Sequence, residues 1–160
     1  MNVSFGKLRL LAESNPSQNR VITSTQRSAM NYAQRAFDPH EKIPFRYGCD
    51  ERTGLEYSLA EALEKKKNAD VYIIAKRNGN VELRVVKTVE GKDGKTKTYI
   101  PCESYENKLL TEINPMQPLN RLQDKFRKFA RRCEYYLLNG ESKINKKKEA
   151  EIRASLDVSE

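Results

Sequence analysis

The chain contains no tryptophan, one histidine and three cysteines among its 160 residues. The cysteines, Cys49, Cys102 and Cys133, are odd in number and far apart, which argues against a secreted disulfide framework. Because His40 is the only imidazole and no Cys-x-x-Cys or Cys-x-x-His spacing occurs, the close ligand pairs of a tetrahedral zinc site are missing. We therefore expect no metal site and no cofactor, and reduced, buried thiols at Cys102 and Cys133.

Long apolar runs are also missing. No segment approaches the ~18–20 apolar residues that a membrane span requires. Residues 1–12, which include Lys7 and Arg9, lack the continuous apolar stretch of a signal peptide. We therefore expect a cytoplasmic protein, although a signal-independent secretion route would leave no trace in the sequence. A hydrophobic content of 38% suffices for one modest core, which predicts a single domain over residues 1–140 and a charged, marginally helical tail over 141–160.

Signatures of catalysis are scarce. His40 follows Asp38-Pro39 in a predicted loop, with no serine or cysteine nucleophile signature beside it, so we interpret it as a surface residue. The run Gly94-Lys95-Thr96 resembles the end of a phosphate-binding Walker A loop. Val89 stands where that motif has its first glycine, and a predicted strand follows where the motif has a helix. The sequence therefore favours a protein that is not an enzyme.

Asp70 and the run Glu82-Leu83-Arg84 resemble the Asp…Glu-x-Lys pattern of restriction-type nucleases, with arginine in place of the lysine. A two-residue turn at Asn78-Gly79 would pair Glu82 with Ala75. The two carboxylates would then be ~17 Å apart, too far to share a metal ion. The pattern of strands therefore argues against a nuclease site.

Residues 70–102 carry the clearest structural pattern. Three β-rich runs, at 70–77, 81–89 and 95–102, are separated by Asn78-Gly79 and Asp93-Gly94, which favour hairpin turns. They predict a three-stranded antiparallel meander. With two-residue turns, the core face carries Tyr72, Ile74, Val81, Leu83, Val85, Val89 and Ile100. The other face carries Val71, Ile73 and Val86 together with Arg77, Arg84, Lys95, Lys97 and Tyr99.

The remaining patterns predict an N-terminal strand over 3–11 and two to four helices, hence an α+β fold. We expect helices over 25–37, capped by Ser24, and from Ser58 onward, where Ser58 and Glu61 form a capping box. A short helix is expected over 105–113. The strongest helix pattern covers 118–138. Its apolar seam comprises Leu119, Leu122, Phe126, Phe129, Cys133 and Tyr136.

Positive charge is abundant, with a net charge of +8. Such a field attracts acidic proteins and nucleic acids alike. We predict two basic contact surfaces. The first is a stripe on the long helix, ~105° from its apolar seam at 100° per residue; it consists of Arg121, Lys125, Lys128 and Arg132. The second is the mixed sheet face, where Arg84 and Lys97 surround the aromatic ring of Tyr99.

Two functions from different classes fit these surfaces. The first is a binding protein of the adaptor, inhibitor or effector type, which docks on an acidic protein through basic and aromatic side chains; the chain has eight tyrosines, and tyrosine and arginine are frequent at interface hot spots. The alternative is a nucleic-acid-binding accessory protein that uses helix 118–138, in which case affinity falls steeply with salt. The protein partner is our first expectation.

Overall fold

The computed structural model describes residues 3–5, 8–13, 22–37, 46–49, 56–140 and 142–157. Its strands are β1 (Val3–Phe5), β2 (Leu8–Ala12), β3 (Arg46–Cys49), β4 (Glu56–Ser58), β5 (Ala69–Ala75), β6 (Val81–Glu90), β7 (Thr96–Tyr99) and β8 (Leu110–Ile113). Its helices are α1 (Ser24–Phe37), α2 (Leu59–Lys67), α3 (Leu119–Cys133) and α4 (Lys143–Leu156), and the π-helix η1 (Glu134–Leu138) continues α3. The expected α+β class is confirmed. No described helix is long and apolar enough to cross a bilayer.

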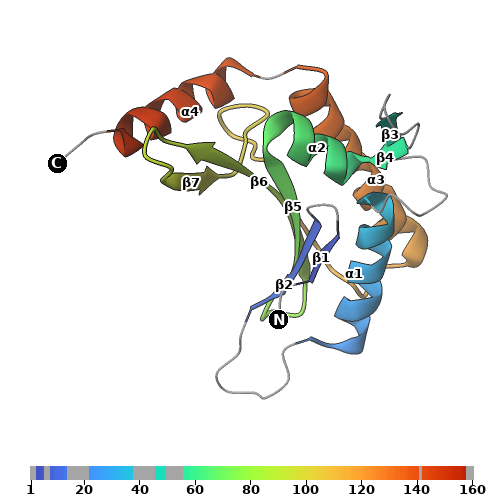
Figure 1. Ribbon diagram of the computed structural model, residues 1–160. Coiled ribbons are helices and arrows are strands. Elements are labelled where there is room, and N and C mark those ends of the chain that lie inside the picture. Colours follow the sequence, from blue (N-terminus) through green and yellow to red (C-terminus); the bar gives the residue numbers. More distant parts are fainter. Residues whose placement is uncertain are drawn as a thin grey trace.

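One curved sheet organises the molecule (Figure 1). Its strand order is β1-β2-β5-β6-β7, and β8 pairs with β6 beside β7. The expected meander corresponds to β5, β6 and β7, which are antiparallel. The single N-terminal strand that we expected over 3–11 is instead a hairpin of two strands, and β2 runs parallel to β5. The short helix expected over 105–113 is wrong, because strand β8 occupies its second half.

Both hairpin turns of the meander contain three residues rather than two. Lys76 and Asn80 close the first turn, since the Lys76 N–H donates to the Asn80 carbonyl at 2.9 Å. Gly91 and Lys95 close the second in the same way, at 2.8 Å. In each turn the third residue is a glycine with positive φ, +93° at Gly79 and +83° at Gly94, as in a type I turn followed by a left-handed glycine.

The extra turn residue shifts the register of both hairpins by one position, which exchanges the two faces of β5 and of β7 relative to β6. Ile73 lies opposite Leu83, and Ile74 lies opposite Glu82. The core face therefore carries Val71, Ile73, Ala75, Val81, Leu83 and Val85, all fully buried. The expected placement of Tyr72 and Ile74 on the core face is wrong, as is that of Val71 and Ile73 on the opposite face.

Helix α1 begins with a capping box formed by Thr23 and Gln26, one residue earlier than the expected Ser24 cap. The Gln26 N–H donates to the Thr23 hydroxyl at 3.1 Å, and the Thr23 N–H donates to the Gln26 side-chain oxygen at 3.0 Å. Gln26 is also buried, and its Nε2 donates to the carbonyls of Lys76 and Asn80. The same side chain therefore starts the helix and fixes it to the β5–β6 turn.

Helix α3 packs its apolar side against α1 and the core face of the sheet. Phe126 and Phe129 are almost fully buried, and the Phe129 ring meets Phe37 of α1 edge-on at 6.5 Å between centroids. The seam differs from the expected one at its ends. Leu119 is 44% exposed, and Leu137, in the wider π-helical turn, is fully buried.

Helix α4 covers the far half of the same side of the sheet, next to β6 and β7 (Figure 1). Ser142 caps it by accepting a hydrogen bond from the Asn145 N–H. Ile152 and Asn145 are buried against the sheet. No helix of the described chain covers the opposite, concave side.

Candidate functional site

The predicted stripe on α3 divides into free and engaged cations. Arg121 and Lys125 are exposed and form no ion pair with any described residue, whereas Lys128 lies 3.0 Å from Asp124 one turn earlier. Arg132 makes a two-pronged contact with Glu103, at 3.0 and 2.9 Å, and also donates to the Lys108 carbonyl. Arg132 therefore holds the 103–108 segment on α3, and the stripe offers fewer free charges than its sequence suggests.

The register shift places the residues of the predicted basic sheet face on two different sides of the sheet. Arg84 pairs with Tyr72 and lies on the concave side of the sheet, where it contacts Glu82. Tyr99 lies opposite Lys87 and Lys97 lies opposite Val89, so both side chains point to the side covered by α4. Arg84 therefore does not share a surface with Lys97 and Tyr99.

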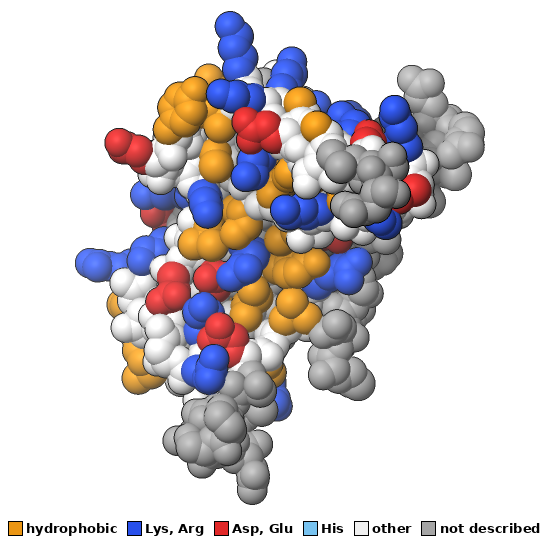
Figure 2. All heavy atoms as spheres, turned by 90° about the vertical axis from the view of Figure 1, so that its left-hand side faces the viewer, with side chains coloured by type: hydrophobic (Ala, Val, Ile, Leu, Met, Phe, Trp, Pro, Cys, Tyr) orange, Lys and Arg blue, Asp and Glu red, His pale blue; other side chains and the backbone are white. Residues whose placement is uncertain are grey.

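The concave side of the sheet combines apolar and charged side chains (Figure 2). Its apolar members follow from the strand register and are Leu11, Tyr72, Ile74, Val86 and Leu110. Most of its charged members pair with one another: Arg9 with Asp70 at 3.2 Å, Lys76 with Glu13 at 3.2 Å and with Glu82 at 3.6 Å. Glu112 instead accepts from the Asn80 side chain at 2.8 Å. This mutual neutralisation leaves little charge for a partner.

The same register bears on the nuclease-like pattern. Glu82 lies opposite Ile74, four positions along the sheet from Asp70, so their separation is ~14 Å. Asp70 is held by Arg9, and Glu82 by Arg84 and Lys76. Among the residues that the structure describes, no cluster of His, Cys, Asp and Glu is arranged to hold a metal ion.

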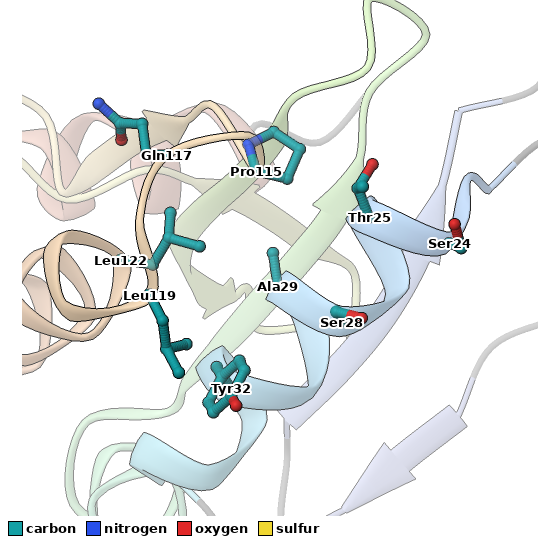
Figure 3. A pocket seen from close by; sticks show the side chains of 9 residues that line it. All are labelled: Ser24, Thr25, Ser28, Ala29, Tyr32, Pro115, Gln117, Leu119 and Leu122. Atoms are coloured by element: carbon teal, nitrogen blue, oxygen red, sulfur yellow. The ribbon is translucent and has the colours of Figure 1, made fainter.

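A pocket of about 280 Å³ lies between α1 and the start of α3 (Figure 3). It is lined by Ser24, Thr25, Ser28, Ala29, Tyr32, Pro115, Gln117, Leu119 and Leu122. None of these side chains is charged. The pocket therefore offers an acidic protein or a phosphate group hydroxyl and amide groups but no cation, so the positive charge of the chain plays no part in it.

A second, larger cavity is lined by positively charged side chains. It measures about 470 Å³ and lies between β7, the segment after it, and α4. It is lined by Lys97, Thr98, Tyr99, Ile100, Cys102, Lys108, Ile144, Asn145, Lys148 and Ile152. We call it the β7–α4 groove. It contains three lysines and no acidic residue, and it contains two of the predicted site residues, Lys97 and Tyr99.

Helical spacing explains how α4 builds one wall of the groove. Residues four apart lie on one face of a helix, and Ile144, Lys148 and Ile152 follow this spacing. Ile152 is buried, whereas Lys148 is exposed. The wall therefore presents an apolar base with a cation above it.

Four polar contacts attach α4 and its cap to β6, β7 and the segment after β7, and so fix the width of the groove. The Asn145 side-chain oxygen accepts from the Cys102 N–H at 2.8 Å, and the Ser142 hydroxyl donates to the Cys102 carbonyl at 3.3 Å. One turn farther, Glu149 accepts from both Lys87 and the Tyr99 hydroxyl, at 2.5 Å each. Lys87 is itself only 3% exposed, so this pairing compensates the charge inside the protein.

The charges lining the groove are not compensated within the described chain. Lys97, Lys108 and Lys148 form no ion pair with any described residue, and all three are exposed. The Asn145 Nδ2 is buried and has no hydrogen-bond acceptor among the described residues, which is unusual for a buried amide. The groove therefore combines three lysines that have no ion-pair partner in the described chain, an apolar base, and a hydrogen-bond donor, the Asn145 Nδ2, without an acceptor.

The two described thiols have different environments. Cys133 is fully buried in the core, and burial raises the pKa of its thiol well above the usual range, so it stays protonated. Cys102 is half-buried at the groove, where its thiol donates to the Ile100 carbonyl at 3.8 Å. Both are free cysteines, as expected, although Cys102 is less buried than predicted. His40 and the side chain of Cys49 lie outside the described residues.

No family model, curated protein or solved structure matched this chain. The functional argument therefore rests on the groove itself. Sequence reasoning missed Lys108, Ile144, Asn145, Lys148 and Ile152. The four-residue spacing of the two isoleucines with Lys148 was a usable signal, because it marks one helical face with an apolar base within a segment rich in lysine and glutamate.

Proposed function

We propose that this chain is a non-enzymatic binding protein that holds an acidic segment of a partner protein in the β7–α4 groove. The observation that supports this proposal is the pairing of three unneutralised lysines with an apolar base in one cavity. Carboxylates of the partner would contact Lys97, Lys108 and Lys148, and an apolar side chain would contact the isoleucines. Adaptors, inhibitors and effectors can all act through such a contact.

The apolar base favours a protein over a nucleic acid. A nucleic-acid site requires cations along a phosphate backbone and exposed rings on which bases stack. The groove has one aromatic ring, Tyr99, and its hydroxyl is bound to Glu149. Three isoleucines offer nothing to a phosphate, whereas they suit the side chain of Leu, Ile, Val or Phe.

The two contributions differ in size. An exposed lysine–carboxylate contact is worth ~0–1 kcal/mol and weakens with salt, whereas full burial of one aliphatic side chain is worth ~1.5–3 kcal/mol. We therefore expect the apolar side chain to supply much of the affinity and the lysines to supply selectivity for acidic segments. Binding should weaken moderately with salt, less steeply than a protein with many phosphate contacts.

The test uses a fluorescein-labelled peptide in which glutamate and leucine alternate. Its controls are the same peptide with lysine for glutamate, the same peptide with serine for leucine, and a labelled single-stranded DNA of equal charge. Fluorescence anisotropy measures binding to the wild type and to the triple variant Lys97→Glu, Lys108→Glu and Lys148→Glu. The matched control is Lys125→Glu, Lys146→Glu and Lys147→Glu, which makes the same change of charge at exposed lysines outside the groove.

We expect the wild type to prefer the acidic, leucine-containing peptide and the groove variant to lose about tenfold or more in affinity, the equivalent of ~1.4 kcal/mol. The matched control should stay close to the wild type. Equal losses in both triple variants would mean that only net charge matters. Preferential binding of the DNA, with a steep salt dependence, would instead support the nucleic-acid alternative.

A further inference from the structure

Strand β7 ends the sheet on one side, so its outer edge has no strand partner in the described chain. In an antiparallel ladder, alternate residues direct their N–H and C=O groups to the neighbouring strand, and the others direct them away. The Thr88 N–H donates to Asn68, on the β5 side of β6. Thr98, opposite Thr88, therefore directs its backbone groups away from β6.

The alternation then applies to the whole of β7. Lys97 and Tyr99 use their backbone groups to pair with Val89 and Lys87, whereas Thr96 and Thr98 present theirs at the outer edge. Thr96 and Thr98 are exposed. The strand thus offers a short row of donors and acceptors at the spacing that another extended chain requires.

The groove runs along this same edge. Successive side chains of a strand point to opposite faces, yet the consecutive residues Lys97, Thr98, Tyr99 and Ile100 all line the cavity. Alternation alone would leave the Thr98 side chain out of a cavity over the α4 side, so the presence of Thr98 in the lining favours a cavity that extends to the edge of the strand. A segment lying in the groove is therefore within reach of both the edge of β7 and the side chains of α4.

We infer that the partner presents an extended segment that pairs with the outer edge of β7 as an added strand. This inference rests on the proposed function and specifies the geometry of the partner. In such pairing, main-chain hydrogen bonds supply affinity and alternate side chains supply specificity. The partner's side chains on the α4 side would meet Lys97, Lys148 and the two isoleucines of α4, so acidic and apolar residues should recur two positions apart.

A proline at position 98 tests the pairing. Proline removes the outward N–H without disturbing the bonds between β7 and β6, because Thr98 does not use its N–H in that ladder. The matched control is Thr98→Val, which keeps the N–H and a β-branched side chain. Both variants are first checked for an unchanged thermal transition and then titrated with the labelled glutamate–leucine peptide.

We expect Thr98→Pro to lower the affinity for the peptide about tenfold, since residue 98 can no longer donate a backbone hydrogen bond to the peptide, and Thr98→Val to bind like the wild type. A second probe does not depend on the folding of a variant. The same peptide carrying N-methyl groups on alternate residues is titrated against the wild type, in the two possible phases of methylation. One phase should bind like the parent peptide, and the other should lose most of its affinity.

The outcomes separate this inference from the proposed function. If Thr98→Pro and both methylated peptides bind like their controls while the groove lysine variant does not, the partner docks through side chains alone. That result overturns strand addition and leaves the proposed function standing. If the groove lysine variant also binds normally, the proposed function itself is overturned.

Discussion

The two halves of β6 lie in one strand and face the same way, yet they are covered differently. Val81, Leu83 and Val85 are fully buried in an apolar core with the phenylalanines of α3. Beyond them, Lys87 is buried beside Glu149 and Tyr99 under α4. Apolar contacts tolerate small shifts, whereas hydrogen-bonded ions need a fixed partner. The first half of β6 therefore contributes mainly to the stability of the fold, whereas the second half holds α4 in position beside the groove.

The strongest test of this comparison is Phe126→Ala, in the apolar half. Phe126 is 2% exposed in the centre of the α3 seam, so its truncation should lower the free energy of unfolding by ~3–5 kcal/mol. Chemical denaturation measures the loss. Leu119→Ala, at the 44% exposed end of the same helix, is the control. A loss below ~1 kcal/mol, as at a surface site, would contradict the core assignment.

In the polar half, Glu149→Gln removes the carboxylate charge that faces the buried Lys87. Hydrogen bonds to charged groups contribute ~1.5–3 kcal/mol, and we expect a loss of stability in that range. Glu151→Gln, exposed on the same helix, should change little. The double variant Lys87→Met and Glu149→Met should recover much of the loss, because paired apolar replacements remove the need for compensation. If the double variant is no better than Glu149→Gln, the charge pair is not the reason for the loss.

The turns of the meander give a smaller, purely local effect. A Cβ added at Gly79 meets no atom within 4 Å, but the residue must adopt a φ of +93°. Left-handed backbone costs an ordinary L-residue ~1–2 kcal/mol, so Gly79→Val should lower the free energy of unfolding by that amount, which the shift of the denaturation midpoint measures. Gly140→Val, also in open space but without a positive φ, is the control. Equal midpoints for the two variants would mean that the positive φ at Gly79 does not cause the loss of stability.

The smallest effect is expected for charge reversal on α3. Lys125 has no ion-pair partner in the described chain, so Lys125→Glu should change stability by less than ~0.5 kcal/mol. Arg132→Glu should cost more, about 1 kcal/mol, because it replaces a two-pronged contact with Glu103 by repulsion. Thermal unfolding compares the two. Similar values would mean that the Arg132–Glu103 contact contributes nothing measurable.

Much of the fold was predictable from the sequence because apolar periodicity determines it. Helices α1 and α3 and the three strands of the meander appear where the patterns place them. The register was not predictable from the dipeptides alone, since Asn78-Gly79 suits both a two-residue turn and the end of a three-residue turn. One residue of turn length then exchanged the faces of β5 and separated Arg84 from Lys97 and Tyr99.

The candidate site was less predictable. Composition identified basic surface, and Lys97 and Tyr99 do line the groove. The other wall comes from α4, whose sequence has few apolar residues and is stabilised by tertiary contacts such as that between Asn145 and Cys102. Helix propensity carries no information about contacts between distant segments. The same limit applies to Arg132, whose partner Glu103 is 29 positions away.

The parallel pairing of β2 with β5 has a consequence for the order of folding. Arg9 and Asp70 are 61 positions apart, yet they are neighbours across this pair. Strands β5 to β8, by contrast, are joined by short connections. Because closing a long loop costs entropy before any contact forms, we expect the meander to assemble first and β2 to dock last. In a pulse-labelling hydrogen-exchange experiment, amides of β6 should be protected before those of β2; simultaneous protection would show that the two ends of the sheet form in one step.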